Sequence, residues 1–260
     1  MSSKGPQPGQ INHSVCRWCY DGIPLETFCE RIKELGIRAI DLCTPEEFAV
    51  LEKHGLVCSM VTHRRADLER GFSHTKYHES LIAVYLELID QAAEHGMPNV
   101  IIFSGNRFGI SEAAGLENCA AGLEKVVKHA EKQDVMVVME LLNSRVDHPD
   151  YQCDHTEWGV ELVDKVGSPN FKLLYDIYHM QIMEGDIIAR IRRYSDYIAH
   201  YHTGGVPGRH EINDTQELNY PPIMRAIVET GYSGYVAQEF LPTYDDPIAA
   251  LREGISICTV

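Results

Sequence analysis

Three carboxylates and one imidazole stand at or near the ends of four successive apolar runs that have the character of β-strands. They are Glu140, Asp176, His202 and Glu239, and each follows the previous one by about one strand–helix unit or a little more. The ends of successive parallel strands meet at one mouth of a barrel, so we expect these side chains to converge there. Three oxygen ligands and one nitrogen suit Mg2+ or Mn2+, with Co2+ as a further option, better than a structural zinc. We therefore predict one bound divalent ion.

A carboxylate that closes an apolar strand also has a simpler explanation, because it could pair with an arginine or cap the next helix. For a single residue the two interpretations carry about equal weight, but four such residues in consecutive units favour a metal site. His200 and His202 have the same parity on their strand and should face the same side. We select His202 because it lies nearer the carboxyl end of the strand, with His200 as the alternative.

Glu140 and Glu239 are also the predicted proton carriers. They come from the fifth and eighth predicted strands, on different sides of the barrel mouth. Two carboxylates beside a metal ion can move a proton on and off a carbon next to a carbonyl group, which the metal polarises. No Gly-x-Ser-x-Gly elbow, no evident Ser-His-Asp set and no His-Glu-x-x-His motif points to a different chemistry.

Six further side chains that offer hydrogen-bond donors or an aromatic face lie just after predicted strands, and they are candidate substrate contacts. They are Trp18, His63, Arg107, His179, Arg209 and His210. Three of them have plain structural alternatives: a core position for Trp18, surface placement for Arg107 and an aromatic-rich turn around His179.

The segment Gly204–Glu211 contains three glycines and one proline, which permit and then stiffen an unusual backbone path. Such a loop can fold over a ligand, with Arg209 and His210 as donors to an anionic or hydroxylated substrate. An ordinary loop with a salt bridge between Arg209 and Glu211 is the alternative.

Strand-like and helix-like segments alternate through the chain. The 260 residues divided among eight units give about 32 residues per unit, the size of a βα repeat. Runs such as Val135–Met139 are continuously apolar, as expected for parallel strands that are buried on both faces. We predict an α/β fold with a single (β/α)8 barrel over residues 11–260 and a disordered tail over residues 1–10; an open doubly wound sheet is the lesser alternative. The strand candidates lie near residues 11–16, 37–43, 56–62, 99–104, 135–142, 171–176, 198–203 and 235–240.

The bulk composition excludes several classes of partner. A net charge of −15 argues against nucleic acids and anionic membranes, and no segment approaches the length of a transmembrane helix. The eight cysteines fall mostly in apolar patterns, and Cys16-x-x-Cys19 has no second pair, so buried or site-lining reduced thiols are expected. A reducing cytoplasm is the expected location, and the polar residues before Gln10 do not form a signal peptide.

With these residues in view, the chain resembles the hydroxypyruvate isomerase family within the xylose isomerase-like sugar isomerases and epimerases. The resemblance covers nearly the whole chain after residue 10. It implies a TIM barrel, a metal held by Glu140, Asp176, His202 and Glu239, and acid/base roles for the two glutamates. Members of the hydroxypyruvate isomerase branch carry glutamine where this chain has His202, whereas ketose 3-epimerases of the superfamily carry histidine. The resemblance is strongest in Val138–Asn143, Tyr175–Gln181, Val206–Glu211 and Gly234–Glu239.

The resulting prediction is a metal-dependent isomerase of a small hydroxy-carbonyl acid or sugar, favouring conversion of hydroxypyruvate to tartronate semialdehyde. A ketose 3-epimerase would use the same site for a longer sugar. A phosphodiester endonuclease would need several zinc ions and a basic face, which the acidic composition opposes. A non-catalytic sugar-binding barrel is the alternative from a different class, and a homo-oligomer is left open.

Overall fold

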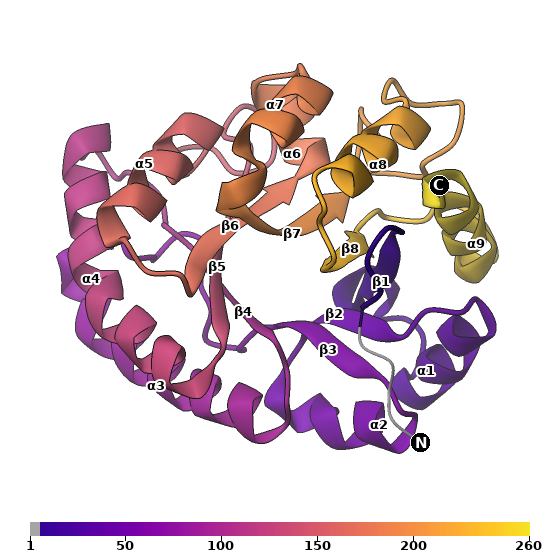
Figure 1. Cartoon of the computed structure of the whole chain (residues 1–260), viewed down its shortest axis with the longest axis horizontal. Helices are drawn as coiled ribbons and strands as arrows, with labels where there is room; N and C mark the ends of the chain where they lie inside the picture. The colour runs from indigo at the N-terminus through magenta and orange to yellow at the C-terminus, as the bar shows by residue number, and fades with distance from the viewer. Residues whose placement is uncertain (1–5) are drawn as a thin grey trace.

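Eight parallel strands form a closed barrel in the computed structural model, which describes residues 6–260 (Figure 1). Each strand pairs with the next one in the sequence, and β8 closes the barrel by pairing with β1. The predicted (β/α)8 barrel is therefore confirmed, and the alternative of an open sheet is wrong. The strands are β1 (Asn12–Cys16), β2 (Ala39–Cys43), β3 (Val57–Val61), β4 (Asn99–Ile102), β5 (Met136–Glu140), β6 (Phe171–Asp176), β7 (Ile198–Thr203) and β8 (Tyr235–Gln238).

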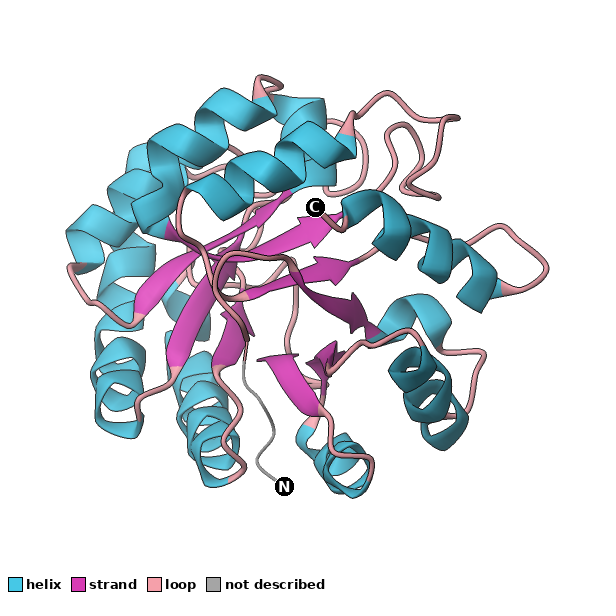
Figure 2. Cartoon of the chain, turned by 45° about the vertical axis from the view of Figure 1, so that its right-hand side comes forward, coloured by secondary structure: helices cyan, strands magenta, loops and turns pink. Residues whose placement is uncertain are grey.

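Helices surround the barrel on its outside, where Figure 2 shows them packed against the strands. They bury one apolar face each against the strands, as with Leu116, Cys119 and Leu123 of α4. The helices are α1 (Leu25–Glu34), α2 (Phe48–Lys53), α3 (His78–Glu94), α4 (Glu112–Gln133), α5 (Thr156–Val166), α6 (Ile177–Met183), α7 (Ile187–Tyr194), α8 (Tyr220–Glu229) and α9 (Pro247–Cys258). Short 3-10 turns precede or follow several of them: η1 (Arg17–Tyr20), η2 (Pro45–Glu47), η3 (Thr75–Tyr77) and η4 (Ser195–Tyr197).

Local sequence signals account for several helix starts. Thr44 and Glu47 form a reciprocal capping box at η2, with Pro45 in the first turn. The hydroxyl of Ser111 accepts a hydrogen bond from the backbone N–H of Ala114 and so caps α4. These caps fix the residue at which each helix begins, and therefore the length of the loop that precedes it.

Strand β2 carries a bulge close to the barrel mouth. Its register against β3 shifts between Asp41 and Cys43, and Leu42 between them has a φ of +60°. A positive φ is unfavourable for leucine, and a bulge of this kind redirects the neighbouring side chains. Here Asp41 lies fully buried inside the barrel, whereas Leu42 is partly exposed at the mouth.

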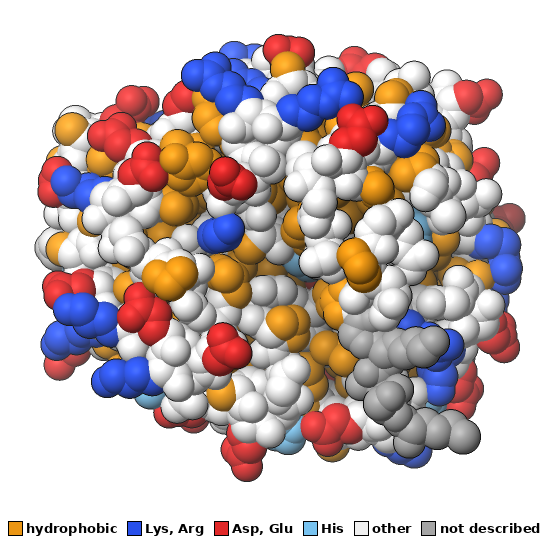
Figure 3. Space-filling view, in the orientation of Figure 1, with side chains coloured by type: hydrophobic (Ala, Val, Ile, Leu, Met, Phe, Trp, Pro, Cys, Tyr) orange, Lys and Arg blue, Asp and Glu red, His pale blue; other side chains and the backbone are white. Residues whose placement is uncertain are grey.

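The chain before β1 is only partly described. Residues 1–5 of the predicted disordered tail lie outside the described residues, and residues 6–10 lead into β1, where Gln7 and Asn12 exchange hydrogen bonds. Disorder over residues 1–10 therefore stays a prediction. Among residues 6–260, no helix has both the length and the apolar character needed to cross a membrane. Acidic and basic side chains are interspersed over the face that Figure 3 shows.

Candidate active site

Four side chains from consecutive strands meet inside the mouth of the barrel. Glu140 ends β5, Asp176 ends β6, His202 lies near the end of β7 and Glu239 directly follows β8. One potential ligand atom from each lies within 4.8 Å of all the others. All four residues are buried, and none is more than 5% exposed. The structure therefore assembles the set that the strand ends predict, with His202 rather than His200 beside the carboxylates.

The two nitrogens of His202 face different surroundings. Nδ1 is buried and lies 2.5 Å from Oε2 of Glu239 and 3.3 Å from Oε1 of Glu140, as ion-pair contacts without an aligned hydrogen bond. An imidazole nitrogen and carboxylate oxygens gathered this closely are the kind of donors that a divalent cation binds. Three carboxylates and one such nitrogen form a donor set that fits Mg2+, Mn2+ or Co2+.

Arg209 inserts its guanidinium into this cluster from the loop after β7. Its Nη2 donates to Oδ2 of Asp176 at 2.8 Å and to Oε2 of Glu239 at 2.5 Å. Its Nε donates to the main-chain oxygen of Glu239, and its Nη1 lies 2.7 Å from Nε2 of His179. Arg209 has a positive φ of +58°, so the loop holds it in an unusual backbone conformation to make these contacts.

The surroundings of Asp176 and Glu239 shift the pKa values of these two carboxyl groups in opposite directions. Burial raises the pKa of Asp176 to about 7, although Arg209 partly offsets that effect. Burial would also raise the pKa of Glu239, but Arg209 and His202 outweigh it and hold that pKa well below its usual range. Burial and the neighbouring Arg209 lower the pKa of His179. Glu239 is thus held ionised, whereas Asp176 takes up a proton near neutral pH without a metal.

A cavity of about 630 Å³ opens above these residues. Glu140, Glu239 and Arg209 form part of its lining. Leu42 of β2 and the segments after β1, β3 and β4 supply a largely apolar wall, which consists of Leu42, Trp18, Ala66, Leu68 and Phe103, together with Thr62 and His63. The loops after the later strands complete the lining with Leu142, Val146, Asp147, His148, Tyr178, Gly208 and Leu241.

A profile of the xylose isomerase-like TIM barrel family matches residues 29–258, which is most of the chain. The chain belongs to this family. Among proteins of known name, it is 30% identical to the 2-oxo-tetronate isomerase of Cupriavidus necator, with 80% of this chain and 83% of that protein covered. It is 26% identical to the hydroxypyruvate isomerase of Escherichia coli, with 82% of this chain and 86% of that protein covered. These names confirm the prediction of an isomerase of the hydroxypyruvate isomerase type.

Two solved structures have the same fold as this chain. A structure described as an AP endonuclease of family 2 from Brucella melitensis superimposes with a TM-score of 0.83 at 23% identity and covers 93% of this chain and 97% of its own. A D-psicose 3-epimerase from Clostridium cellulolyticum superimposes with a TM-score of 0.73 at 21% identity, covering 95% of this chain and 92% of its own. At these identities the likeness concerns the barrel alone.

Four of the six predicted substrate contacts lie at the mouth of the barrel in the structure. Trp18 and His63 line the cavity, and the indole Nε1 of Trp18 donates to Oε1 of Glu239 at 2.6 Å. Arg209 lines the cavity as well, and His179 lies directly behind it, with a main-chain and a side-chain N–H of Asn143 directed at its Nδ1.

The other two predicted contacts lie elsewhere. Arg107 binds the main-chain oxygen of Tyr151 and the carboxylate of Asp154, so it fastens one loop to another. His210 is exposed, and its Nδ1 pairs with the main-chain oxygen of Leu241. Neither side chain lines the cavity.

Asp41 is a residue near the site that strand-end reasoning missed. Its Oδ2 lies 3.1 Å from Nε2 of His202 and 2.5 Å from Nε2 of His200. The sequence does contain a signal, since an aspartate interrupts the apolar run around Ile40 and Leu42. A search restricted to strand ends does not find this aspartate, because it stands two residues before the end of its strand.

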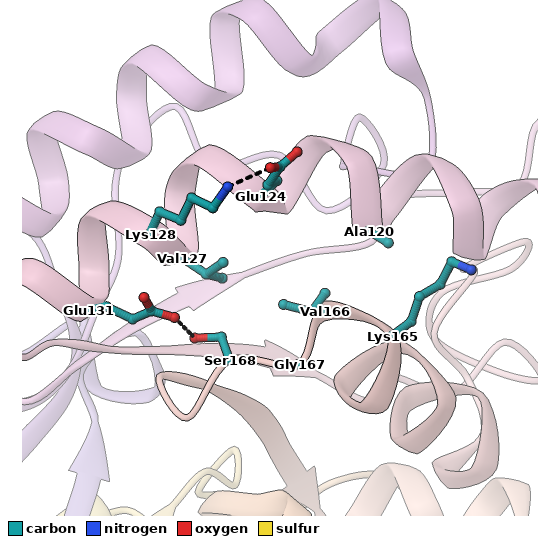
Figure 4. Close-up of a pocket in the computed structure, with 9 residues that line it drawn as sticks. All are labelled: Ala120, Glu124, Val127, Lys128, Glu131, Lys165, Val166, Gly167 and Ser168. Atoms are coloured by element: carbon teal, nitrogen blue, oxygen red, sulfur yellow. Dashed lines mark hydrogen bonds and ion pairs between the residues drawn. The ribbon is translucent and has the colours of Figure 1, made fainter.

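A second hollow, of about 430 Å³, lies on the outside of the barrel between α4 and the turn after α5 (Figure 4). Its polar groups are largely paired with one another or with neighbouring helix residues. Lys128 binds Glu124, Ser168 binds Glu131, and Lys165 binds Glu117. Because these charges already have partners, the barrel mouth remains the stronger candidate for the functional site.

Proposed function

We propose that the protein is a divalent-metal-dependent isomerase that converts hydroxypyruvate into tartronate semialdehyde. The observation that carries this proposal is the convergence of one potential ligand atom from each of Glu140, Asp176, His202 and Glu239 within 4.8 Å of one another. Mg2+ and Mn2+ are the favoured ions, followed by Co2+. The two named relatives, which act on a three-carbon and a four-carbon keto acid by their names, support a small keto acid as substrate.

The chemistry requires a proton to leave C3 and another to arrive at C2. A divalent ion held by the four residues would polarise the substrate carbonyl and stabilise the negative charge that develops on oxygen. Removal of a C3 proton leaves an enediolate. Transfer of the O3 hydroxyl proton to O2 and protonation at C2 then leave an aldehyde at C3 and a hydroxyl group at C2. Glu140 and Glu239, which both line the cavity, are the groups that remove and return these protons.

The surroundings of the two glutamates favour Glu140 as the first base. Glu239 already interacts with Trp18, Arg209 and His202, and its pKa is held low mainly because the last two outweigh burial. A carboxylate so strongly stabilised as an anion is a weak proton acceptor. Glu140 has a looser contact, at 3.3 Å from His202 Nδ1.

Arg209 is the proposed partner of the substrate carboxylate. Within the described part of the chain, it is the residue lining this cavity that carries a permanent positive charge. Its guanidinium now neutralises Asp176 and Glu239. A bound divalent ion would neutralise part of the charge of Asp176 and Glu239. The planar guanidinium of Arg209 would then be available to bind the carboxylate of the substrate.

The size of the cavity favours a second candidate, an isomerase or 3-epimerase of a longer substrate. Its volume of about 630 Å³ is that of a site for a ligand well above three carbons in size. A four-carbon keto acid or a ketose would fill more of the space beside Leu42 and Phe103. A non-catalytic sugar-binding barrel remains the alternative from another class.

The deciding experiment is turnover by metal-stripped protein to which Mg2+, Mn2+ or Co2+ is returned. Hydroxypyruvate, 2-oxo-tetronate and a ketohexose are offered separately, and products are followed by NMR with Mg2+ and by chemical trapping with the other ions. Glu140→Gln, prepared in the same way, controls for contaminating isomerases. Metal-dependent tartronate semialdehyde supports the proposal, product from a longer substrate alone transfers it to the second candidate, and bound metal without any product supports the binding barrel.

A further inference from the structure

Asp41 occupies a fully buried position directly beneath the proposed metal ligands. It projects from β2 just before the bulge at Leu42, and none of its surface is exposed. An isolated buried carboxylate is strongly unfavourable, so its partners reveal what it is held there to do.

Four donors surround this carboxylate, two on each oxygen. The hydroxyl of Ser14 donates to Oδ1 at 2.5 Å, and the hydroxyl of Ser59 donates to the same atom. Nε2 of His200 lies 2.5 Å and Nε2 of His202 3.1 Å from Oδ2. An ionised carboxylate offers about four acceptor positions and no donor, so the four contacts match its full capacity.

This arrangement has a direct consequence for His202. A neutral imidazole carries its proton on one nitrogen and a lone pair on the other. A lone pair on Nε2 would face the acceptor oxygen of Asp41, which is repulsive, whereas an Nε2–H makes a charge-assisted hydrogen bond. Nδ1 faces carboxylate oxygens as well, those of Glu239 and Glu140. A cation bound between these oxygens and Nδ1 would accept the lone pair of Nδ1, and Asp41 is then the acceptor that holds the single ring proton on Nε2.

We propose that Asp41 is a positioning residue that accepts the Nε2–H of His202 and thereby fixes the ring and its tautomer, with Nδ1 directed at the metal ion. This role depends on the metal site proposed above, but not on which substrate is turned over. Histidine ligands in proteins generally donate their second ring N–H to such a partner, and loss of that partner weakens metal binding by about 10- to 100-fold.

A bulge in β2 directly follows Asp41. Without the extra residue at Leu42, the strand would continue its regular alternation of side chains to the mouth. Leu42 holds a strained positive φ between Asp41, which is paired with Met60, and Cys43, which is paired with Val61. The local backbone thus stores strain at the position that separates the buried carboxylate from the cavity wall.

Cys16 offers a competing explanation. One ligand atom from each of Cys16, Asp41 and His202 also lies within 4.8 Å of the others, so the three could form a second metal site. The saturation of Asp41 by two hydroxyls and two imidazoles argues against it. The stoichiometry of metal binding separates the two explanations.

The first test uses the wild-type protein, labelled with 15N-histidine and loaded with diamagnetic Mg2+. Long-range proton–nitrogen correlation spectra distinguish the two imidazole tautomers. We expect His202, assigned by its loss in His202→Gln, to carry its proton on Nε2. A proton on Nδ1 of the metal-loaded protein overturns the proposal without any need for a folded Asp41 variant.

The second test measures Mn2+ binding by calorimetry, independently of turnover. Asp41→Asn should retain the fold and one binding site but bind Mn2+ about 10- to 100-fold more weakly. The amide N–H of asparagine can donate to Nε2 of His202, which favours the tautomer with its proton on Nδ1. Asp154→Asn is the matched control, since it makes the same change at a buried aspartate held instead by Arg107 and Ser144. Unchanged affinity in Asp41→Asn, or two Mn2+ ions per wild-type chain, overturns the proposal.

A double-mutant cycle with His202→Ala separates control of the imidazole from a general structural effect. An alanine side chain has no ring nitrogen for Asp41 to orient. Asp41→Asn should therefore weaken Mn2+ binding by less than about threefold in the His202→Ala background. An equal loss in both backgrounds contradicts the proposal, because Asp41 would then act through other partners.

Discussion

Arg209 provides the sharpest test of how the cluster of buried carboxylates is stabilised without metal. Its side chain is 12% exposed, while those of its partners Asp176 and Glu239 are 0% and 4% exposed. Removing one partner of a buried ion pair costs about 3–5 kcal/mol, because the remaining charges stay buried and uncompensated. In metal-free protein, Arg209→Met should therefore lower Tm by roughly 6–20 °C for a chain of this length.

A divalent ion would compensate the same carboxylates, so the penalty should shrink when metal is bound. We expect saturating Mn2+ to raise Tm more in Arg209→Met than in the wild type. Thermal unfolding by circular dichroism, with EDTA and with Mn2+, measures both effects. Arg107→Met is the matched control, since Arg107 pairs with Asp154 and its loss should cost the same with or without metal. An equal drop in Tm for Arg209→Met under both conditions would refute this reasoning.

Four further expectations follow from the contacts of the site. Glu140→Gln should lower kcat for the preferred substrate by about 10²- to 10⁴-fold at saturating metal, and steady-state kinetics showing near wild-type kcat would contradict its role as a base. Burial raises the pKa of Asp176 to about 7, and this carboxyl must lose its proton to bind Mn2+. The apparent affinity for Mn2+ should therefore rise as the pH rises through about 7, with release of a proton on binding. Calorimetry in buffers of different ionisation enthalpy measures that proton release. The raised pKa of Asp176 also contributes to the stability of the metal-free fold, fully so below pH 3.8, the ordinary pKa of an aspartate. This contribution should be lost as the pH rises through about 7 in EDTA, and chemical denaturation at each pH measures it. Trp18→Phe removes the indole donor to Glu239 and should lower kcat/KM about tenfold with little change in Tm; an unchanged kcat/KM would show that this hydrogen bond is idle.

The sequence was sufficient to predict the barrel and the central side chains because both follow from short-range patterns. The run Val135–Met139 is buried on both faces, as its continuous apolar character indicates, and Glu140 ends the strand at the mouth. Strand parity places His200 and His202 on one side, and the position nearer the strand end selects the residue beside the carboxylates.

The contacts that could not be predicted depend on loops and on one irregular strand. Arg209 and His210 are adjacent in the sequence, yet one enters the cluster and the other stays exposed, because a positive φ at Arg209 sets their directions. Arg107 turns to Asp154, a residue 47 positions later in a loop whose path no periodic pattern describes. Asp41, which contacts His202, lies next to a bulge at Leu42. The apolar sequence around Leu42 does not indicate this bulge.

Three apolar side chains of the cavity stand apart from the charged groups. The carboxylates and His202 lie at the ends of β5–β8, whereas Leu42 lies in β2, and Leu68 and Phe103 lie in the segments after β3 and β4. None of these three side chains is a proposed metal ligand or proton carrier. Evolution can therefore change which molecule is accepted by exchanging these side chains, while the groups that move protons stay the same.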